Sequence, residues 1–206
     1  MKVSTTCKIN ISGVQINDQP WDKCPEMTGA LVKDLRKVYD ARRDKYSKFH
    51  KMDPFCKLGY LAGEFLFDKI QETIPGHRIG MFLTNSFSSI HTDIAFYNSY
   101  SADEQSIASP SLFVYTLPNI LLGELAIRHK ITGEHAFFLR EQFGSDFIYL
   151  YVKCLFDRDL IDAAIVGGVE VTPATFHAKM AWISRDETIG NEETLNAETF
   201  GTLLLP

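Results

Sequence analysis

Short apolar segments of strand length alternate with longer segments of helical periodicity along this chain, and this alternation constrains the fold more than any other feature. Strands that alternate with helices are typical of a mostly parallel sheet covered by helices on both faces. The length of 206 residues corresponds to one domain. We therefore predict a single α/β domain over residues 1–206, with three α/β/α layers and a mixed, mostly parallel sheet of about five strands.

Five segments are predicted to form these strands. Each combines apolar or β-branched residues over a short length and is bounded by turn-forming residues. They are residues 8–15, 78–84, 136–139, 163–168 and 179–184. The first is closed by a turn over 17–20, and a polar loop is expected after the second.

Helices are predicted between the strands. Asp53 can cap free backbone N–H groups, and Pro54 fits the first position of a helix that runs to about Ile70 with one apolar stripe facing the core. A second helix is expected over 118–130. A third, over 146–156, is apolar around most of its circumference, which predicts burial on several sides.

The charge balance and the lack of targeting or ligand patterns narrow the functional classes. A net charge of −5 gives the chain no global attraction to nucleic acid. The longest charge-free run is broken by Pro110 and Pro118, so no membrane span is expected, and an N-terminus without an apolar stretch predicts a cytoplasmic protein. The four cysteines form no CxxC pair and the histidines lack ligand spacing, so we expect neither a metal nor a cofactor.

A basic segment interrupts this acidic chain. Residues 33–51 contain eight basic residues against three acidic ones. The basic residues are Lys33, Arg36, Lys37, Arg42, Arg43, Lys45, Lys48 and Lys51. Such a run usually forms a solvated helix face, and the alternative is a docking surface for an acidic partner.

Three segments in one order resemble the N-terminal half of β-ketoacyl synthases, whose fold is thiolase-like. The first runs from Lys51-Met-Asp-Pro-Phe-Cys-Lys-Leu58 to the strand 78–84, which ends in Thr. The second, 117–133, contains a Pro-Asn pair and a closing glycine, and the third, 159–170, ends in Gly-Gly-x-Glu. The motif residues are Pro118, Asn119, Gly133, Gly167, Gly168 and Glu170. The resemblance implies that the domain is a thiolase-like half.

The resemblance also implies where a nucleophile would stand. In active members a strand leads from the closing glycine to a Cys at the start of a buried helix, and ungapped counting from Gly133 places Gln142 there. Such a Cys is activated because the helix dipole favours its thiolate, whereas an amide cannot attack a thioester. Glu141, Gly144 and Ser145 stand beside Gln142. The resemblance is therefore to a member that has lost its nucleophile.

The remaining cysteines and histidines do not restore a catalytic site. No Cys occurs between Cys56 and Cys154. Cys154 falls in the apolar helix 146–156, and a buried free Cys behaves as a small hydrophobic side chain, so we predict a structural role for it. Active family members take catalytic histidines from a C-terminal half that this chain has no room for, and its own six histidines are expected at loops or helix ends.

A chain equivalent to one half of a synthase is expected to expose apolar surface and therefore to associate. The family pairs its subunits through the strand before the nucleophile. We predict a homodimer, or a heterodimer with a ketosynthase-like subunit, in which this strand lies at the contact. Its residues are His135, Ala136, Phe137, Phe138, Leu139 and Arg140.

Two functions from different classes remain open. The first is a catalytically inactive ketosynthase-like protein that serves as an accessory or binding subunit in fatty-acid or polyketide biosynthesis, with a synthase or an acidic acyl carrier protein as its partner. The second is an acyl-thioester decarboxylase or hydrolase in which Gln142 and the helix N-terminus hold an enolate or carboxylate. Glu141 and Glu170 are then the nearby acid–base candidates.

The C-terminal part is predicted to be exposed and acidic. Residues 186–198 contain five acidic residues and no basic one. The following residues, 200–205, are apolar enough to pack back onto the domain or onto a partner.

Overall fold

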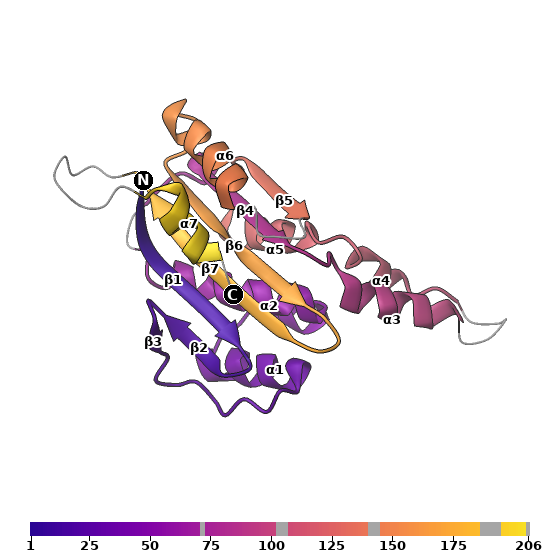
Figure 1. Ribbon diagram of the computed structural model, residues 1–206. Helices are drawn as coiled ribbons and strands as arrows, with labels where there is room; N and C mark the ends of the chain where they lie inside the picture. Colours follow the sequence, from indigo (N-terminus) through magenta and orange to yellow (C-terminus); the bar gives the residue numbers. More distant parts are fainter. Residues whose placement is uncertain (71–72, 102–106, 140–144, 186–194, 205–206) are drawn as a thin grey trace.

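The structure is a computed structural model that describes residues 1–70, 73–101, 107–139, 145–185 and 195–204 (Figure 1). One sheet crosses the molecule, and helices cover both of its faces. The α/β class and the three α/β/α layers predicted from the sequence are therefore confirmed.

Seven strands form the sheet in the described part of the chain. They are β1 (Lys2–Asn10), β2 (Gly13–Ile16), β3 (Gln19–Pro20), β4 (Ile79–Asn85), β5 (His135–Leu139), β6 (Ala163–Val171) and β7 (Phe176–Ser184). Their order is β3-β2-β1-β7-β6-β4-β5, so β5 forms one edge. β5, β4 and β6 pair in parallel, whereas β7 is antiparallel to both β6 and β1. Consequently β2 and β7 run in one direction and the other strands in the opposite one.

The strand count corrects the prediction of about five strands. The predicted strand 8–15 is in fact the end of β1 and most of β2, which a turn at Ile11 and Ser12 joins. Ile11 continues the apolar alternation of β1 but is 60% exposed, and Gly13 has a φ of +133°, which glycine tolerates. Most strands share one direction as predicted, yet most neighbouring pairs are antiparallel, because β2 and β7 each lie between strands of opposite direction.

The described residues also form α-helices and short 3₁₀-helices. They are α1 (Leu31–Arg42), η1 (Ser47–Lys51), α2 (Pro54–Phe67), η2 (Gly76–Arg78), α3 (Ile90–Ser101), α4 (Pro110–Val114), α5 (Ile120–His129), α6 (Ser145–Asp157) and α7 (Ala197–Leu204). α1, α2 and α5 cover one face of the sheet, and α6 and α7 cover the other. The predicted start of α2 is confirmed, since Asp53 accepts a hydrogen bond from the Cys56 N–H (2.9 Å) and Pro54 holds the first position.

Helix α6 is less buried than its composition predicts. Ile148 and Val152 are fully buried against the sheet, but Phe147 and Leu150 are 46% and 63% exposed, and Cys154 is exposed. The predictions of burial on several sides and of a buried Cys154 are therefore wrong. A helix that covers a sheet meets it along one stripe, and among the described elements α7 is the main further contact of α6.

The C-terminal helix α7 packs back onto the domain. Phe200 is fully buried, and its ring lies 5.6 Å from that of Tyr149 in α6. The predicted packing of the apolar C-terminal residues is thus confirmed for Phe200. Residues 186–194 of the acidic segment lie outside the described residues.

The segment after β4 is not the polar loop that we predicted. It forms α3 and α4, which together project beyond the end of the sheet and which we call the arm (Figure 1). Ser109 caps α4 by accepting a hydrogen bond from the Leu112 N–H (3.4 Å), and Pro110 holds its first position. The Ser89 hydroxyl donates to the Thr116 carbonyl (2.6 Å), which joins the two ends of the arm.

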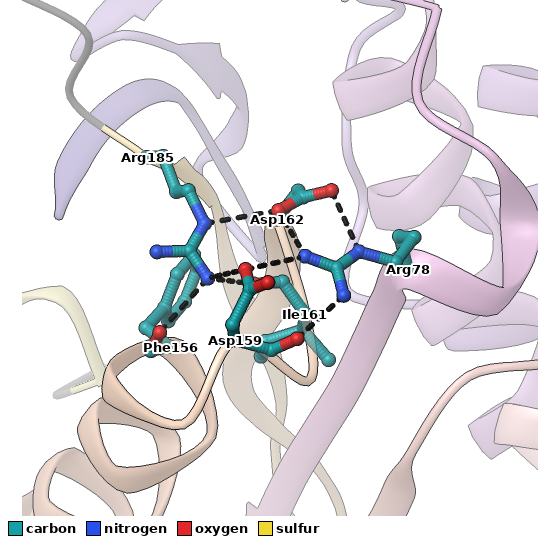
Figure 2. A network of polar contacts seen from close by, with 6 residues as sticks. All are labelled: Arg78, Phe156, Asp159, Ile161, Asp162 and Arg185. Atoms are coloured by element: carbon teal, nitrogen blue, oxygen red, sulfur yellow. Dashed lines mark hydrogen bonds and ion pairs between the residues drawn. The ribbon is translucent and has the colours of Figure 1, made fainter.

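Two arginines and two aspartates connect strand ends (Figure 2). They lie at the end of the sheet where β4 and β6 begin, whereas the arm follows the end of β4. Arg78 precedes β4 and donates to both oxygens of Asp162 (2.8 and 2.6 Å), which precedes β6. Arg185 follows β7 and donates to Asp162 (2.9 Å) and to Asp159 (2.7 Å). The network therefore fixes the start of two parallel strands and the end of β7.

We expect Asp162→Asn to lower the free energy of unfolding by about 1 kcal/mol at neutral pH and by less in acid. Hydrogen bonds from Arg78 and Arg185 hold the pKa of Asp162 at about 2, below its ordinary value of 3.8. Because the folded pKa is the lower one, the stabilisation is present at neutral pH and is lost as the pH falls from about 4 to about 2.

Urea unfolding of wild type and variant at neutral pH and at about pH 2.5 measures this difference. The control is Asp157→Asn, which removes an exposed ion pair with Lys153 and should change stability little. If Asp162→Asn lowers the free energy of unfolding equally at both pH values, the prediction is wrong.

Candidate functional site

Buried polar residues gather where β4 and β6 end. Thr84 and Asn85 close β4, Glu170 lies near the end of β6, and Ser89 and Thr92 follow in the loop and first turn of α3. All five are buried. In α/β sheets, ligands bind at the carboxyl ends of parallel strands. We therefore treat these five residues, named the strand-end cluster, as the candidate site.

Glu170 carries the ionisable side chain of the strand-end cluster. Its Oε2 accepts a hydrogen bond from the Ser86 N–H (2.8 Å), and Oε1 has no hydrogen-bond partner among the described residues. Burial raises the pKa of Glu170, and the backbone hydrogen bonds from Ser86 and Phe87 offset this only in part. The residue is 4% exposed, so the structure supports a role in positioning the loop after β4 rather than in contacting a substrate.

Side-chain hydrogen bonds also hold the loop between β4 and α3. The Asn85 amide donates to the Ser88 carbonyl (2.7 Å) and accepts from its N–H (3.1 Å), which supports the positive φ of Ser88. The Thr92 hydroxyl donates to the Asp53 carboxylate (2.5 Å) and so connects α3 to the start of α2. Most polar groups of the strand-end cluster therefore form hydrogen bonds with other parts of the chain.

The expected nucleophile position lies outside the described residues. This applies to Gln142 and to its neighbours Arg140, Glu141 and Gly144. β5 ends at Leu139, and α6 begins six residues later at Ser145. The five residues between them, 140–144, lie outside the described residues. The predicted strand before this position and the predicted helix after it are thus confirmed, and the role of Gln142 stays a prediction.

Strand β5 forms an edge of the sheet, and no strand in the described part of the chain pairs with its outer side. It pairs with β4 on one side, and its sequence His-Ala-Phe-Phe-Leu has no Pro, Lys or bulge to block a further strand. Leu139 is 55% exposed. Phe137 packs on Phe55 of α2 and Phe138 on Phe147 of α6, with ring centroids 5.9 and 5.4 Å apart. Helices on both faces of the sheet therefore hold β5 in place, and its outer edge has no partner strand among the described residues.

Seven of the eight basic residues predicted to bind a partner are exposed. The exception is Arg42, whose guanidinium bonds to Asp68 (2.7 Å), lies over the Phe65 ring (4.3 Å) and is 7% exposed. Arg36, Lys37 and Lys48 contact carboxylates at 3.9, 3.6 and 3.8 Å. The remaining exposed basic residues form a basic surface along α1 and η1. They are Lys33, Arg43, Lys45 and Lys51. Arg42 packs beneath this surface.

The motif glycines lie against neighbouring backbone. A Cβ on Gly133 would stand 2.3 Å from the Ile79 carbonyl oxygen, and one on Gly167 would stand 2.3 Å from the Lys179 carbonyl oxygen in β7. Gly168 is buried beside Gly167 in β6. A close approach of this kind admits only glycine, which gives these positions a packing role.

The remaining motif residues and one histidine define the ends of α5. Pro118 and Asn119 precede the helix, and Asn119 makes no side-chain capping bond. His129 ends it, stacks on Phe67 with ring centroids 3.5 Å apart, and lies 2.5 Å from the Glu64 carboxylate. Burial favours the neutral form of Glu64, but the contacts with His129 and the adjacent arginine outweigh burial and lower its pKa. This histidine is therefore structural.

A cavity of about 270 Å³ lies beside the strand-end cluster, between the start of α3 and the β6–β7 turn. Ile11, His91, Thr172 and Phe176 are among its lining residues, and the described residues that line it include no carboxylate or thiol. Within the described residues, no three His, Cys, Asp or Glu side chains are placed to hold a metal ion. Among those same residues, no helix has the length and apolar character to cross a membrane.

The fold is shared with solved ketosynthase structures. The ishigamide ketosynthase/chain length factor matches with a TM-score of 0.64 and 12% identity over 90% of this chain and 62% of that one. The ketosynthase ApeO in complex with its chain length factor ApeC, from Xenorhabdus doucetiae, matches with 0.58 and 10% over 90% and 79%. A type II polyketide synthase ketosynthase, bound to a hexaketide and in complex with its acyl carrier protein, matches with 0.61 and 13% over 89% and 62%.

The chain therefore has the thiolase-like fold of ketosynthases and chain length factors, and it spans less than two thirds of the length of the first of these structures. No protein-family model and no curated protein matches the sequence. Similarity at 10–13% identity shows the fold alone.

Sequence reasoning found Glu170 but missed the rest of the strand-end cluster. Asn85, Ser89 and Thr92 are separated along a segment that we interpreted as a loop, and the parallel pairing of β4 with β6 brings Glu170 to them. A usable signal was the polar sequence directly after the apolar run 79–83, because that is where α/β proteins place polar sites.

Proposed function

We propose that this chain is a catalytically inactive ketosynthase-like protein that acts as an accessory or binding subunit in polyketide or fatty-acid biosynthesis. The observation that carries the proposal is the fold, which solved ketosynthases and chain length factors share. One of these structures pairs a ketosynthase with its chain length factor, and another pairs a ketosynthase with an acyl carrier protein. In this proposal residues 1–206 are one domain, equivalent to the N-terminal half of such a subunit.

The chemistry of the available side chains supports an inactive role. Gln142 stands at the expected nucleophile position in the sequence, and an amide is not a nucleophile toward a thioester. Burial, and then the Asp53 carboxylate, raise the pKa of Cys56, so its thiol stays protonated. Cys154 lies in the last turn of α6, whereas position 142 precedes the first turn. Neither thiol therefore replaces the missing nucleophile.

Two surfaces support a partner role. The open edge of β5 offers backbone hydrogen bonds and exposed apolar side chains to a second ketosynthase-like subunit, which is either another copy of this chain or a synthase. The exposed basic residues within 33–51 would attract an acyl carrier protein, because carrier proteins are acidic and opposite charges steer association.

A second candidate is the decarboxylation or hydrolysis of an acyl thioester. The start of α6 at Ser145 favours it, because the free N–H groups of a helix N-terminus stabilise the negative charge that develops on an enolate or oxyanion. Its general acid or base would have to come from a residue such as Glu141, since Glu170 is buried and hydrogen-bonded to backbone.

We expect the protein to bind an immobilised synthase or acyl carrier protein and to show no turnover of malonyl or acetyl carrier thioesters. Mass spectrometry would detect loss of carbon dioxide, release of acid or a covalent adduct. Leu139→Lys should weaken synthase binding at least about tenfold, because a charge on an edge strand opposes the addition of a further strand. Ile127→Lys, at a residue of α5 that is 63% exposed, is the matched control.

Turnover without partner binding would favour the second candidate. If Leu139→Lys leaves synthase binding intact, the contact does not lie at β5. If the protein shows no binding and no turnover, both candidates are contradicted.

A further inference from the structure

The cavity between the start of α3 and the β6–β7 turn lies where α/β sheets bind ligands. β6 ends directly before the lining residue Thr172, and α3, which carries His91, follows the end of the parallel neighbour β4. Ligands of such sheets bind outside the carboxyl ends of the strands. The cavity volume of about 270 Å³ is just below the range of about 300–1,000 Å³ that holds drug-sized ligands. The position therefore indicates a binding site, and the volume limits its ligand to a small molecule.

Most of the cavity wall is apolar and none of its described residues is charged. The apolar side chains come from the β1–β2 turn, the start of α1 and the β6–β7 turn with the first residue of β7. They are Ile11, Leu31, Pro173, Ala174 and Phe176. Among the described residues that line the cavity, none is Lys, Arg, Asp or Glu. A charged ligand would lose its hydration here without meeting an opposite charge, which is costly. The wall therefore favours an uncharged ligand with an apolar body.

His91 gives this apolar wall one ionisable side chain among the described residues. Its Nδ1 is buried and has no hydrogen-bond partner in the described part of the chain. Buried polar atoms in native proteins are nearly always hydrogen-bonded, so the imidazole lacks a partner that these residues do not supply. A neutral imidazole has one N–H donor and one acceptor nitrogen, and a hydroxyl group can accept from the first or donate to the second. A ligand with one hydroxyl group therefore suits this ring.

Hydrogen bonds fix two sides of the cavity. The Thr172 hydroxyl accepts from the N–H groups of Ala174 (3.2 Å) and Thr175 (3.1 Å), which holds the β6–β7 turn. The buried Asp34 carboxylate accepts from the N–H and the hydroxyl of Thr28 (both 2.9 Å), which holds the segment before α1. Small-molecule sites are usually preformed in this way, because little conformational entropy is then lost on binding.

We propose that this cavity binds a small uncharged molecule made of one aromatic ring and one hydroxyl group. The rings of Phe176, Pro173 and His91 in the wall suit a flat ligand, and a rigid ring loses less conformational entropy on binding than a flexible chain. The hydroxyl bonds to the imidazole of His91. Because the ligand contacts both the start of α3 and the β6–β7 turn, its binding stabilises the attachment of the arm to the sheet. This site goes beyond the partner role in the proposed function and does not depend on it.

Benzyl alcohol tests the proposal, with benzoate and benzylammonium as charged analogues of the same ring. NMR titration of the full chain at neutral pH measures the dissociation constants from the shifts of backbone amides in 90–92 and 172–176, apart from Pro173. We expect benzyl alcohol to bind with a dissociation constant of about 1 mM or lower. Each charged analogue should bind at least about tenfold more weakly, because the described wall offers no opposite charge.

Two variants locate the ligand. Ile11→Asp places a carboxylate in the apolar wall and should weaken benzyl alcohol binding at least about tenfold. His91→Phe keeps a ring but removes the hydrogen bond, so it should weaken benzyl alcohol binding about fivefold and leave the binding of toluene unchanged. Ile11 is 60% exposed, so its variant should melt at the wild-type temperature, and Ala174→Asp in the exposed turn replaces it if it does not. Ile127→Asp, on α5 and 63% exposed, is the control and should leave binding unchanged.

The outcomes separate this inference from the proposed function. If benzyl alcohol does not bind up to about 10 mM, or if the charged analogues bind equally well, the inference is overturned. If Ile11→Asp binds benzyl alcohol as tightly as the wild type, the ligand lies outside the cavity, and if His91→Phe does so, the hydroxyl does not bond to His91. Either result overturns the inference and leaves the accessory function as it stands. A chain that binds benzyl alcohol in this cavity but neither a synthase nor a carrier protein would contradict the proposed function and keep the site.

Discussion

Gly167→Ala is expected to lower the free energy of unfolding by about 3 kcal/mol. The added methyl carbon would lie 2.3 Å from the Lys179 carbonyl oxygen and 2.8 Å from the Met180 Cα, both of which are backbone atoms of β7. β6 is paired on one side with β4 and on the other with β7, so the strand cannot shift away without breaking a ladder. The clash must therefore be relieved by distortion in the centre of the sheet.

Urea unfolding followed by circular dichroism measures this loss. Gly123→Ala is the matched control, because a Cβ on Gly123 would have no heavy atom within 4 Å and α5 should gain up to about 1 kcal/mol from the better helix former. If the free energy of unfolding of Gly167→Ala lies within about 0.5 kcal/mol of the wild-type value, β6 and β7 separate easily at this point and the prediction is wrong.

Asp53→Ala is expected to lower the free energy of unfolding by about 2–4 kcal/mol. The Asp53 side chain caps α2 through the Cys56 N–H (2.9 Å) and accepts the hydroxyl hydrogen of Thr92 (2.5 Å). Loss of a helix cap costs about 1 kcal/mol. The Thr92 hydroxyl, on a residue that is 1% exposed, would also lose its acceptor, which costs a further 1–3 kcal/mol or so.

A double-mutant cycle tests whether these two effects share one contact. Thr92→Val removes the hydroxyl that Asp53→Ala leaves unpaired, so the double variant should lose less stability than the sum of the single variants. Hydrogen exchange of α3 should become faster in either single variant, because the contact holds the base of the arm. Strict additivity would show that the two side chains stabilise the fold independently.

Elements specified by local chemistry could be predicted from the sequence. The start of α2 follows from Asp53 and Pro54 alone, and the central strands follow from apolar runs bounded by turn residues. The N-terminal hairpin was missed because Ile11 continues the alternation through a turn, and a pattern of apolar residues does not show where the chain reverses.

Exposure was the property that the sequence did not reveal. Leu150 and Cys154 belong to an apolar helix, and whether they are covered depends on α7, which is distant in the chain. The arm was taken for a loop because Ser86, Ser88 and Ser89 open it with residues that favour turns. For the candidate site, the resemblance located the strand and helix around position 142, while the strand-end cluster depends on the register between β4 and β6.

The place of β1 in the sheet has a consequence for synthesis of the protein in the cell. β1 is translated before β7, the last strand along the described chain, yet the two are neighbours in the sheet. On the ribosome, Ile9 of β1 must therefore stay without its partner Ala178 until Phe176–Ser184 has emerged. Contacts between such distant segments form slowly, and the waiting hairpin is a natural target for chaperones that bind nascent chains.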